Sequence, residues 1–70
     1  MTDLQSTVKG KNGREYFVST VQMYDGYQTC IFNDEGVEVL KLLYTTEESA
    51  ITGHSNAEKF VEGSGLGLWR

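Results

Sequence analysis

Residues 12–48 read NGREYFVSTVQMYDGYQTCIFNDEGVEVLKLLYTTEE and decide the fold of this 70-residue chain. Three turn sequences interrupt the stretch: Asn12-Gly13, Asp25-Gly26 and Asn33-Asp34-Glu35-Gly36. The runs around them are rich in β-branched and aromatic residues, which is typical of strands joined by tight hairpins. A helix start follows the last run. The sequence therefore predicts an α+β fold: a four-stranded antiparallel β-meander with one C-terminal α-helix packed on one face.

The expected helix begins where threonines precede two glutamates. Thr45 as N-cap with Glu48 three residues later matches a capping box, and Thr46 is the alternative N-cap. An apolar stripe at helical spacing is expected to face the sheet: Ala50, Ile51, His54, Ala57 and Val61, with Phe60 at its flank. Gly53 lets this helix approach the sheet closely, and Gly63 is expected to end it.

The turn types predict which side chains share a face of the sheet. Two-residue type I′ loops at the first two turns place Lys11 opposite Arg14 and Tyr24 opposite Tyr27. Alternation along the strands then collects one apolar face, predicted to be the core: Leu4, Val8, Phe17, Val21, Met23, Cys30 and Phe32. A three-residue loop at the third turn, which we prefer, adds fourth-strand residues to that face: Leu40, Leu42 and Tyr44. A four-residue loop would place them opposite.

The other face of the expected sheet also carries apolar side chains, several of them tyrosines. We predict that this face is a partner or oligomer interface: Tyr16, Val18, Tyr24, Tyr27, Ile31, Val39 and Leu43. A patch of this extent is typical of an interface, and tyrosine offers a large apolar body with a polar tip. The alternative is that Leu66, Leu68 and Trp69 fold back over it within one chain.

Size and composition favour one small domain that needs support. Apolar residues make up 39% of the chain and charged residues 23%, so we expect one α+β domain over residues 1–63 and a flexible glycine-rich tail over 64–70. A core this small rarely leaves more than about 3–5 kcal/mol of net folding stability. Cys30 and His54 are the only cysteine and histidine, which argues against disulfides and structural zinc. We expect no cofactor and a homo-oligomer, a dimer or larger.

The formal net charge of −4 is unevenly distributed. Residues 25–63 contain eight acidic residues and two lysines, so we do not expect nucleic-acid binding. Lys9, Lys11 and Arg14 gather in the first hairpin, where they form a candidate site for a small anionic ligand. No apolar run approaches the roughly 18 residues of a membrane span, and the N-terminus lacks a signal pattern. We therefore expect a cytoplasmic location and no membrane contact.

One pair of residues suggests catalysis. Cys30 and His54 are both expected on the core side, where a thiol and an imidazole could form a nucleophile and its base. No third orienting group and no oxyanion loop accompany them, and a small buried cysteine is the simpler interpretation. We therefore predict no catalytic or metal-binding residues, and a protein that is not an enzyme.

The stretch from Tyr27 to His54 resembles a pattern in small uncharacterised proteins of bacteriophages and prophages. It reads Tyr27-Gln28-Thr29-Cys30-Ile31-Phe32, then Tyr44-Thr45-Thr46-Glu47-Glu48-Ser49-Ala50-Ile51-Thr52-Gly53-His54. The family pattern is Tyr-Glu-Thr-x-Ile/Val-Phe followed by Tyr-x-Thr-Glu-Glu-x-Ala-x-x-Gly-His, so Gln28 departs from the usual acid. The resemblance implies a phage or prophage origin, hence the cytoplasm of a host bacterial cell. It implies no activity.

These observations together lead us to expect a non-enzymatic phage or prophage accessory protein. It would bind a host factor and inhibit or modulate it, in host takeover or counter-defence. Two alternatives remain at this point. One is an oligomeric small-molecule binder, for instance a nucleotide sponge acting through the basic hairpin. The other is a minor virion or assembly component.

Overall fold

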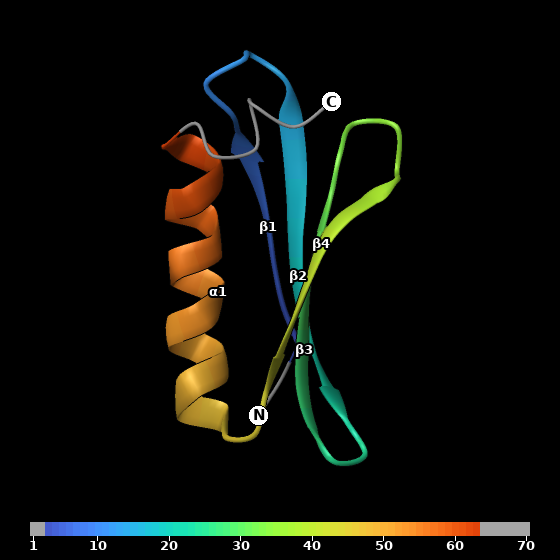
Figure 1. Cartoon of the computed structure of the whole chain (residues 1–70), viewed down its shortest axis with the longest axis vertical. Helices are drawn as coiled ribbons and strands as arrows, with labels where there is room; N and C mark the ends of the chain where they lie inside the picture. The colour runs from blue at the N-terminus through green and yellow to red at the C-terminus, as the bar shows by residue number, and fades with distance from the viewer. Residues whose placement is uncertain (1–2, 64–70) are drawn as a thin grey trace.

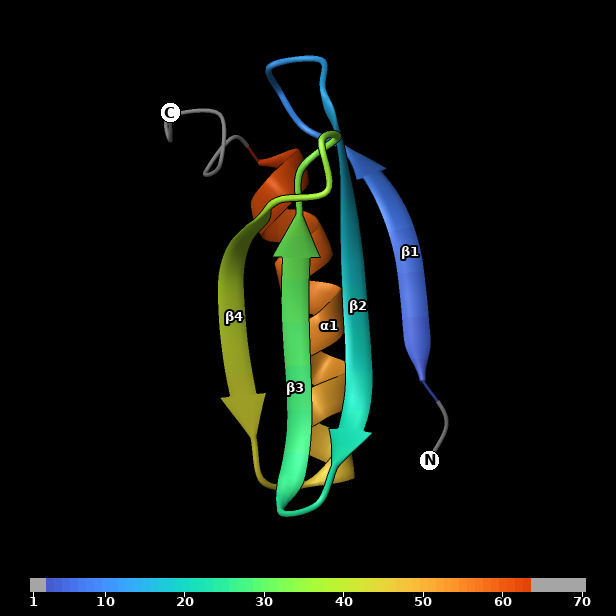
Figure 2. The same cartoon turned by 90° about the vertical axis from the view of Figure 1, so that its right-hand side faces the viewer.

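A computed structural model describes residues 3–63 of the chain. Its elements follow one another along the sequence: β1 (Leu4–Lys9), β2 (Glu15–Met23), β3 (Gly26–Phe32), β4 (Glu38–Tyr44) and α1 (Glu47–Glu62). The strands form one antiparallel sheet in the order β1-β2-β3-β4. Figures 1 and 2 show α1 on one side of this sheet only. The predicted α+β meander with a C-terminal helix is confirmed.

The first hairpin is one residue longer than predicted. The Gly10 N–H donates to the Arg14 carbonyl (2.8 Å) and the Gly13 N–H to the Gly10 carbonyl (3.0 Å), which closes a three-residue loop over 11–13. Gly13 adopts a left-handed φ of 84°, the conformation that such a loop requires. The Asn12 amide donates to the Tyr16 hydroxyl at 2.9 Å and so ties the loop to β2. Val8 consequently pairs with Tyr16, and the predicted pairing was off by one residue.

The second hairpin turns earlier than predicted. Met23 pairs with Gly26, so Tyr24 and Asp25 are the loop residues and Tyr24 does not face Tyr27. The backbone at Gly26 has φ 155°, and a Cβ there would overlap the carbonyl of Tyr44, so this position needs glycine. A shift of two residues leaves each side chain on its predicted side, because side chains alternate with a period of two.

The third hairpin has the predicted three-residue loop. The Asn33 N–H donates to the Val37 carbonyl (2.9 Å), and Gly36 adopts φ 81°. The Asn33 side chain accepts hydrogen bonds from the N–H groups of Glu35 and Val37, both at 2.9 Å. A register shift between Ile31 and Phe32 follows and pairs Ile31 with Leu40. This irregularity brings the inward residues of β4 to the same side as Ile31.

The core lies on the face of the sheet opposite to the predicted one. The covered face, against which α1 packs, consists of six buried residues: Val8, Tyr16, Val18, Thr20, Thr29 and Ile31. The open face lies on the other side and carries five residues that were predicted as core: Phe17, Val21, Met23, Cys30 and Phe32. Leu43 of the predicted interface lies on the same face. The predicted core residues Val8, Leu40, Leu42 and Tyr44 do lie on the covered face. Both faces are apolar, so alternation alone did not identify the covered one. His54 on α1 marks the covered face, because its hydrogen-bond partners Thr20 and Ser6 both lie on that face.

α1 contacts the sheet through small side chains. Its buried residues are Ala50, Gly53, His54, Ala57 and Val61. Ile51 was predicted among them but is 48% exposed, and Gly53 faces the sheet beside Tyr44. Thr46, the alternative N-cap, caps the helix by accepting from the Ser49 N–H at 3.1 Å. Gly63 ends the helix as predicted, with its N–H bonded to the Lys59 carbonyl at 2.8 Å.

Candidate functional site

Among residues 3–63, several large apolar side chains on the open face are exposed. Phe17, Met23 and Leu43 are 41%, 44% and 72% exposed. Val21 and Phe32 are half-buried. Three neighbouring strands contribute these side chains because β2, β3 and β4 pair side by side. Aromatic residues and methionine are enriched where proteins contact one another, so this face is the candidate binding site.

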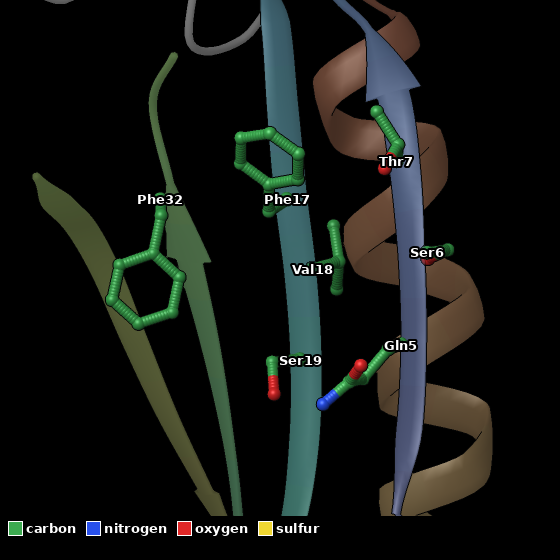
Figure 3. Close-up of a pocket in the computed structure, with 7 residues that line it drawn as sticks. All are labelled: Gln5, Ser6, Thr7, Phe17, Val18, Ser19 and Phe32. Atoms are coloured by element: carbon green, nitrogen blue, oxygen red, sulfur yellow. The ribbon is translucent and has the colours of Figure 1, made fainter. Parts of the chain in front are cut away.

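Two phenylalanines form the centre of one end of the open face. Phe17 on β2 pairs directly with Phe32 on β3. A shallow groove beside them is lined by residues of β1, β2 and β3: Gln5, Ser6, Thr7, Phe17, Val18, Ser19 and Phe32. Figure 3 shows the Gln5 side chain reaching toward Ser19 across the gap between β1 and β2. The groove therefore presents two aromatic rings next to amide and hydroxyl groups, a mixture that suits a protein surface better than a small apolar ligand.

Charged residues of both signs surround the apolar centre. Lys9 and Glu15 are paired across β1 and β2. Lys41 pairs with Cys30, and Glu38 pairs with Phe32, which places one cation and one anion at the β4 side. A charged, solvent-exposed rim around a more apolar centre is the usual anatomy of a protein interface.

The interface predicted from the sequence falls mostly on the wrong side of the sheet. Tyr16, Val18 and Ile31 are 5%, 1% and 0% exposed and belong to the core under α1. Tyr27 and Val39 are half-buried, and Val39 packs against that core. Two members remain outside the core. Tyr24 is fully exposed in the β2–β3 turn, and Leu43 lies on the open face.

The three cations of the predicted anion site do not form one cluster. Arg14 reaches the β3–β4 loop, where its guanidinium bonds the Asp34 carboxylate through two 3.2 Å contacts. Glu35 lies 3.9 Å from the same guanidinium. Lys9 faces Glu15 on the open face, and Lys11 is exposed in the first loop. Acidic neighbours thus offset two of the three charges, which weakens the attraction for a small anion.

Cys30 and His54 lie on opposite faces of the sheet, so the suggested nucleophile–base pair does not form. Cys30 belongs to the open face, paired with Ser19, whereas His54 bonds the next residue, Thr20. Burial raises the pKa of the Cys30 thiol, and this outweighs the Gln28 amide, which donates to Sγ at 3.2 Å. A raised pKa keeps the thiol protonated at neutral pH and weakens it as a nucleophile.

A hydrogen-bonded chain of hydroxyls connects His54 to the sheet. Thr29 Oγ1 lies 2.6 Å from Thr20 Oγ1, which lies 2.7 Å from His54 Nδ1. On the other side of the ring, Nε2 lies 3.0 Å from Ser6 Oγ and 3.4 Å from Glu58 Oε2. Within residues 3–63, every buried side-chain nitrogen and oxygen has a hydrogen-bond partner. This cluster was missed at the sequence level, although Thr20 and Thr29 share a face of the sheet in both the predicted and the observed register.

No family model, no curated protein and no solved structure matches this sequence. Among residues 3–63 there is no group of three or more His, Cys, Asp or Glu side chains that could hold a metal ion. The same residues contain no helix long and apolar enough to cross a membrane.

Proposed function

We propose that this protein is a non-enzymatic binding protein, a phage or prophage accessory factor that binds a host protein through the open face of its sheet. Binding would inhibit or modulate that host factor in the bacterial cytoplasm. The observation that carries the proposal is the open face itself, with exposed Phe17, Met23 and Leu43 inside a charged rim. Exposed apolar patches bordered by polar residues are typical of protein interaction sites.

The phage origin rests on the resemblance of residues 27–54 alone. Several residues of that pattern stabilise the junction of β4 and α1 or the packing of α1 on the sheet. Thr46 caps the helix, a Cβ at Gly53 would overlap the Tyr44 ring, and His54 bonds Thr20. These residues of the pattern would therefore serve the fold. Phe17, Met23 and Leu43 of the open face lie outside the pattern, whereas Phe32 belongs to it.

A pair of matched variants tests the proposal. Met23→Glu places a charge on the open face, and Ile51→Glu places one on α1 at a side chain of similar exposure, 44% against 48%. We expect wild type and Ile51→Glu to capture the same protein from host lysate, and Met23→Glu to lose it. Calorimetry with that purified protein should then give a loss of affinity of tenfold or more for Met23→Glu, which corresponds to about 1.4 kcal/mol.

Equal capture by both variants would contradict binding through the open face. Binding only to purified virus particles, with none to host proteins, would favour the virion alternative. A gain in melting temperature with nucleotides alone would favour the sponge, because a ligand that binds only the folded state stabilises it.

A further inference from the structure

A second groove runs between the edge of the sheet and the helix. β4 is an edge strand of the sheet. Figure 2 shows α1 behind β2 and β3, with β4 at the left edge of the sheet. The side chains of β4 and α1 therefore form the walls of an apolar groove: Leu40, Leu42, Tyr44, Gly53, Asn56, Ala57 and Phe60. Leu40, Leu42 and Tyr44 are half-buried, so the groove exposes apolar surface that no element within residues 3–63 covers.

The groove changes character along α1. Toward the start of the helix it continues into a polar part that shares Tyr44, Gly53 and Asn56 with the apolar part. Polar and acidic side chains line this continuation: Thr46, Glu48, Ser49 and Thr52. From the C-terminal end of α1 to its N-terminal end, the surface thus runs from Phe60 and the leucines to the carboxylate of Glu48.

We infer that this groove is the docking site of the chain's own C-terminal segment, residues 66–70. These residues read LGLWR and follow Gly63, which lies three residues beyond Phe60 at the apolar end of the groove. Read from that end, the segment offers Leu66, Leu68 and Trp69 first and the cation Arg70 last. The groove offers apolar side chains first and Glu48 last, so the two orders match in polarity and in charge.

The lengths agree as well. Residues 66–70 span about 16 Å when extended at about 3.3 Å per residue. Along α1, the distance from Phe60 back to Ser49 is also about 16 Å, at about 1.5 Å of rise per residue. A chain that reverses direction through Gly63, Ser64 and Gly65 and then follows the groove brings Arg70 beside Glu48. Side chains alternate along an extended segment, so Leu66, Leu68 and Arg70 then face one wall of the groove and Trp69 faces the other.

The connection favours docking on the groove over pairing as a fifth strand beside β4. In Figure 2, β4 runs downward at the left edge with α1 behind the sheet and running upward. A further strand to the left of β4 and parallel to it would complete a left-handed crossover. About 98% of such crossovers are right-handed. A segment that lies in the groove and contacts β4 and α1 through its side chains is not subject to this constraint.

Trp69 makes the inference directly measurable, because it is the only tryptophan in the chain. Its fluorescence reports on the segment alone. We expect the wild type to emit at a shorter wavelength than a free LGLWR peptide and to be less accessible to acrylamide. Phe60→Ser should shift the emission to that of the peptide, whereas Ile51→Glu, outside the groove, should leave it unchanged. An emission in wild type equal to that of the peptide would overturn the inference.

A charge exchange tests the direction of docking without depending on the stability of Phe60→Ser. Glu48→Arg should increase acrylamide quenching of Trp69, and adding Arg70→Glu should restore the wild-type value. Failure of the double variant to recover would contradict the pairing of Arg70 with Glu48. A blue shift that disappears on dilution would place the segment in the groove of a second copy and would overturn docking within one chain.

Discussion

The covered face of the sheet buries polar side chains, whereas the open face leaves large apolar side chains exposed. The covered face contains Thr20 and Thr29, both 0% exposed, whereas the open face leaves Phe17 and Met23 more than 40% exposed. Hydrophobicity alone would place the phenylalanine and methionine under the helix. Hydrogen bonding as well as hydrophobicity therefore determines which face is covered, because the imidazole of His54 on α1 finds the Thr20 hydroxyl on that face.

The largest expected difference in stability is between truncating a side chain on the covered face and truncating one on the open face. Ile31→Ala removes a fully buried side chain from the covered face and should lower the free energy of unfolding by about 2–5 kcal/mol. Met23→Ala on the open face should cost less than about 1 kcal/mol. Urea denaturation followed by circular dichroism measures both.

Ile31→Ala removes a large share of the net stability of so small a domain, so Ile31→Val provides a milder variant. It should cost about 0.5–1.5 kcal/mol. A larger cost for Met23→Ala than for Ile31→Val would mean that the open face is covered in solution.

A smaller effect is expected from the hydroxyls that meet His54. Thr20→Val keeps the shape but leaves Nδ1 of His54 buried without its 2.7 Å partner. The expected loss is about 1–3 kcal/mol, the usual cost of an unsatisfied buried polar group. Ser19→Val, one residue away and on the open face, is the matched control and should change stability by less than about 0.5 kcal/mol. Equal effects would show that the threonine contributes only by packing.

The sequence predicted the elements well because each has a local cause. Turn residues such as Gly36 with a left-handed φ and the cap at Thr46 act within a few residues of themselves. The third loop has the predicted length because the Asn33 side chain bonds its own turn. These features need no knowledge of the rest of the chain, and they fix the order of strands and helix.

The choice of face could not be predicted in the same way, because its causes are not local. Asn12-Gly13 suits a two-residue or a three-residue loop, and the contact from Asn12 to Tyr16 accompanies the longer one. β2 carries apolar side chains on both sides, so alternation describes either face equally well. The candidate site consequently contains residues that were assigned to the core, Phe17 among them, while Tyr16 of the predicted interface is buried.

Cys30 gives the smallest expected effect and tests how open the open face is. Its side chain belongs to that face but is only 6% exposed, and burial raises the pKa of its thiol. We therefore expect iodoacetamide to modify Cys30 more slowly in the folded protein than in urea at neutral pH. Because the folded state disfavours the thiolate, stability should also fall as the pH rises through the ordinary pKa of a thiol. Cys30→Ser should remove that part of the pH dependence. Equal alkylation rates in the folded and unfolded chains would mean that the strands around Cys30 open readily, and that the open face is less rigid than the covered one.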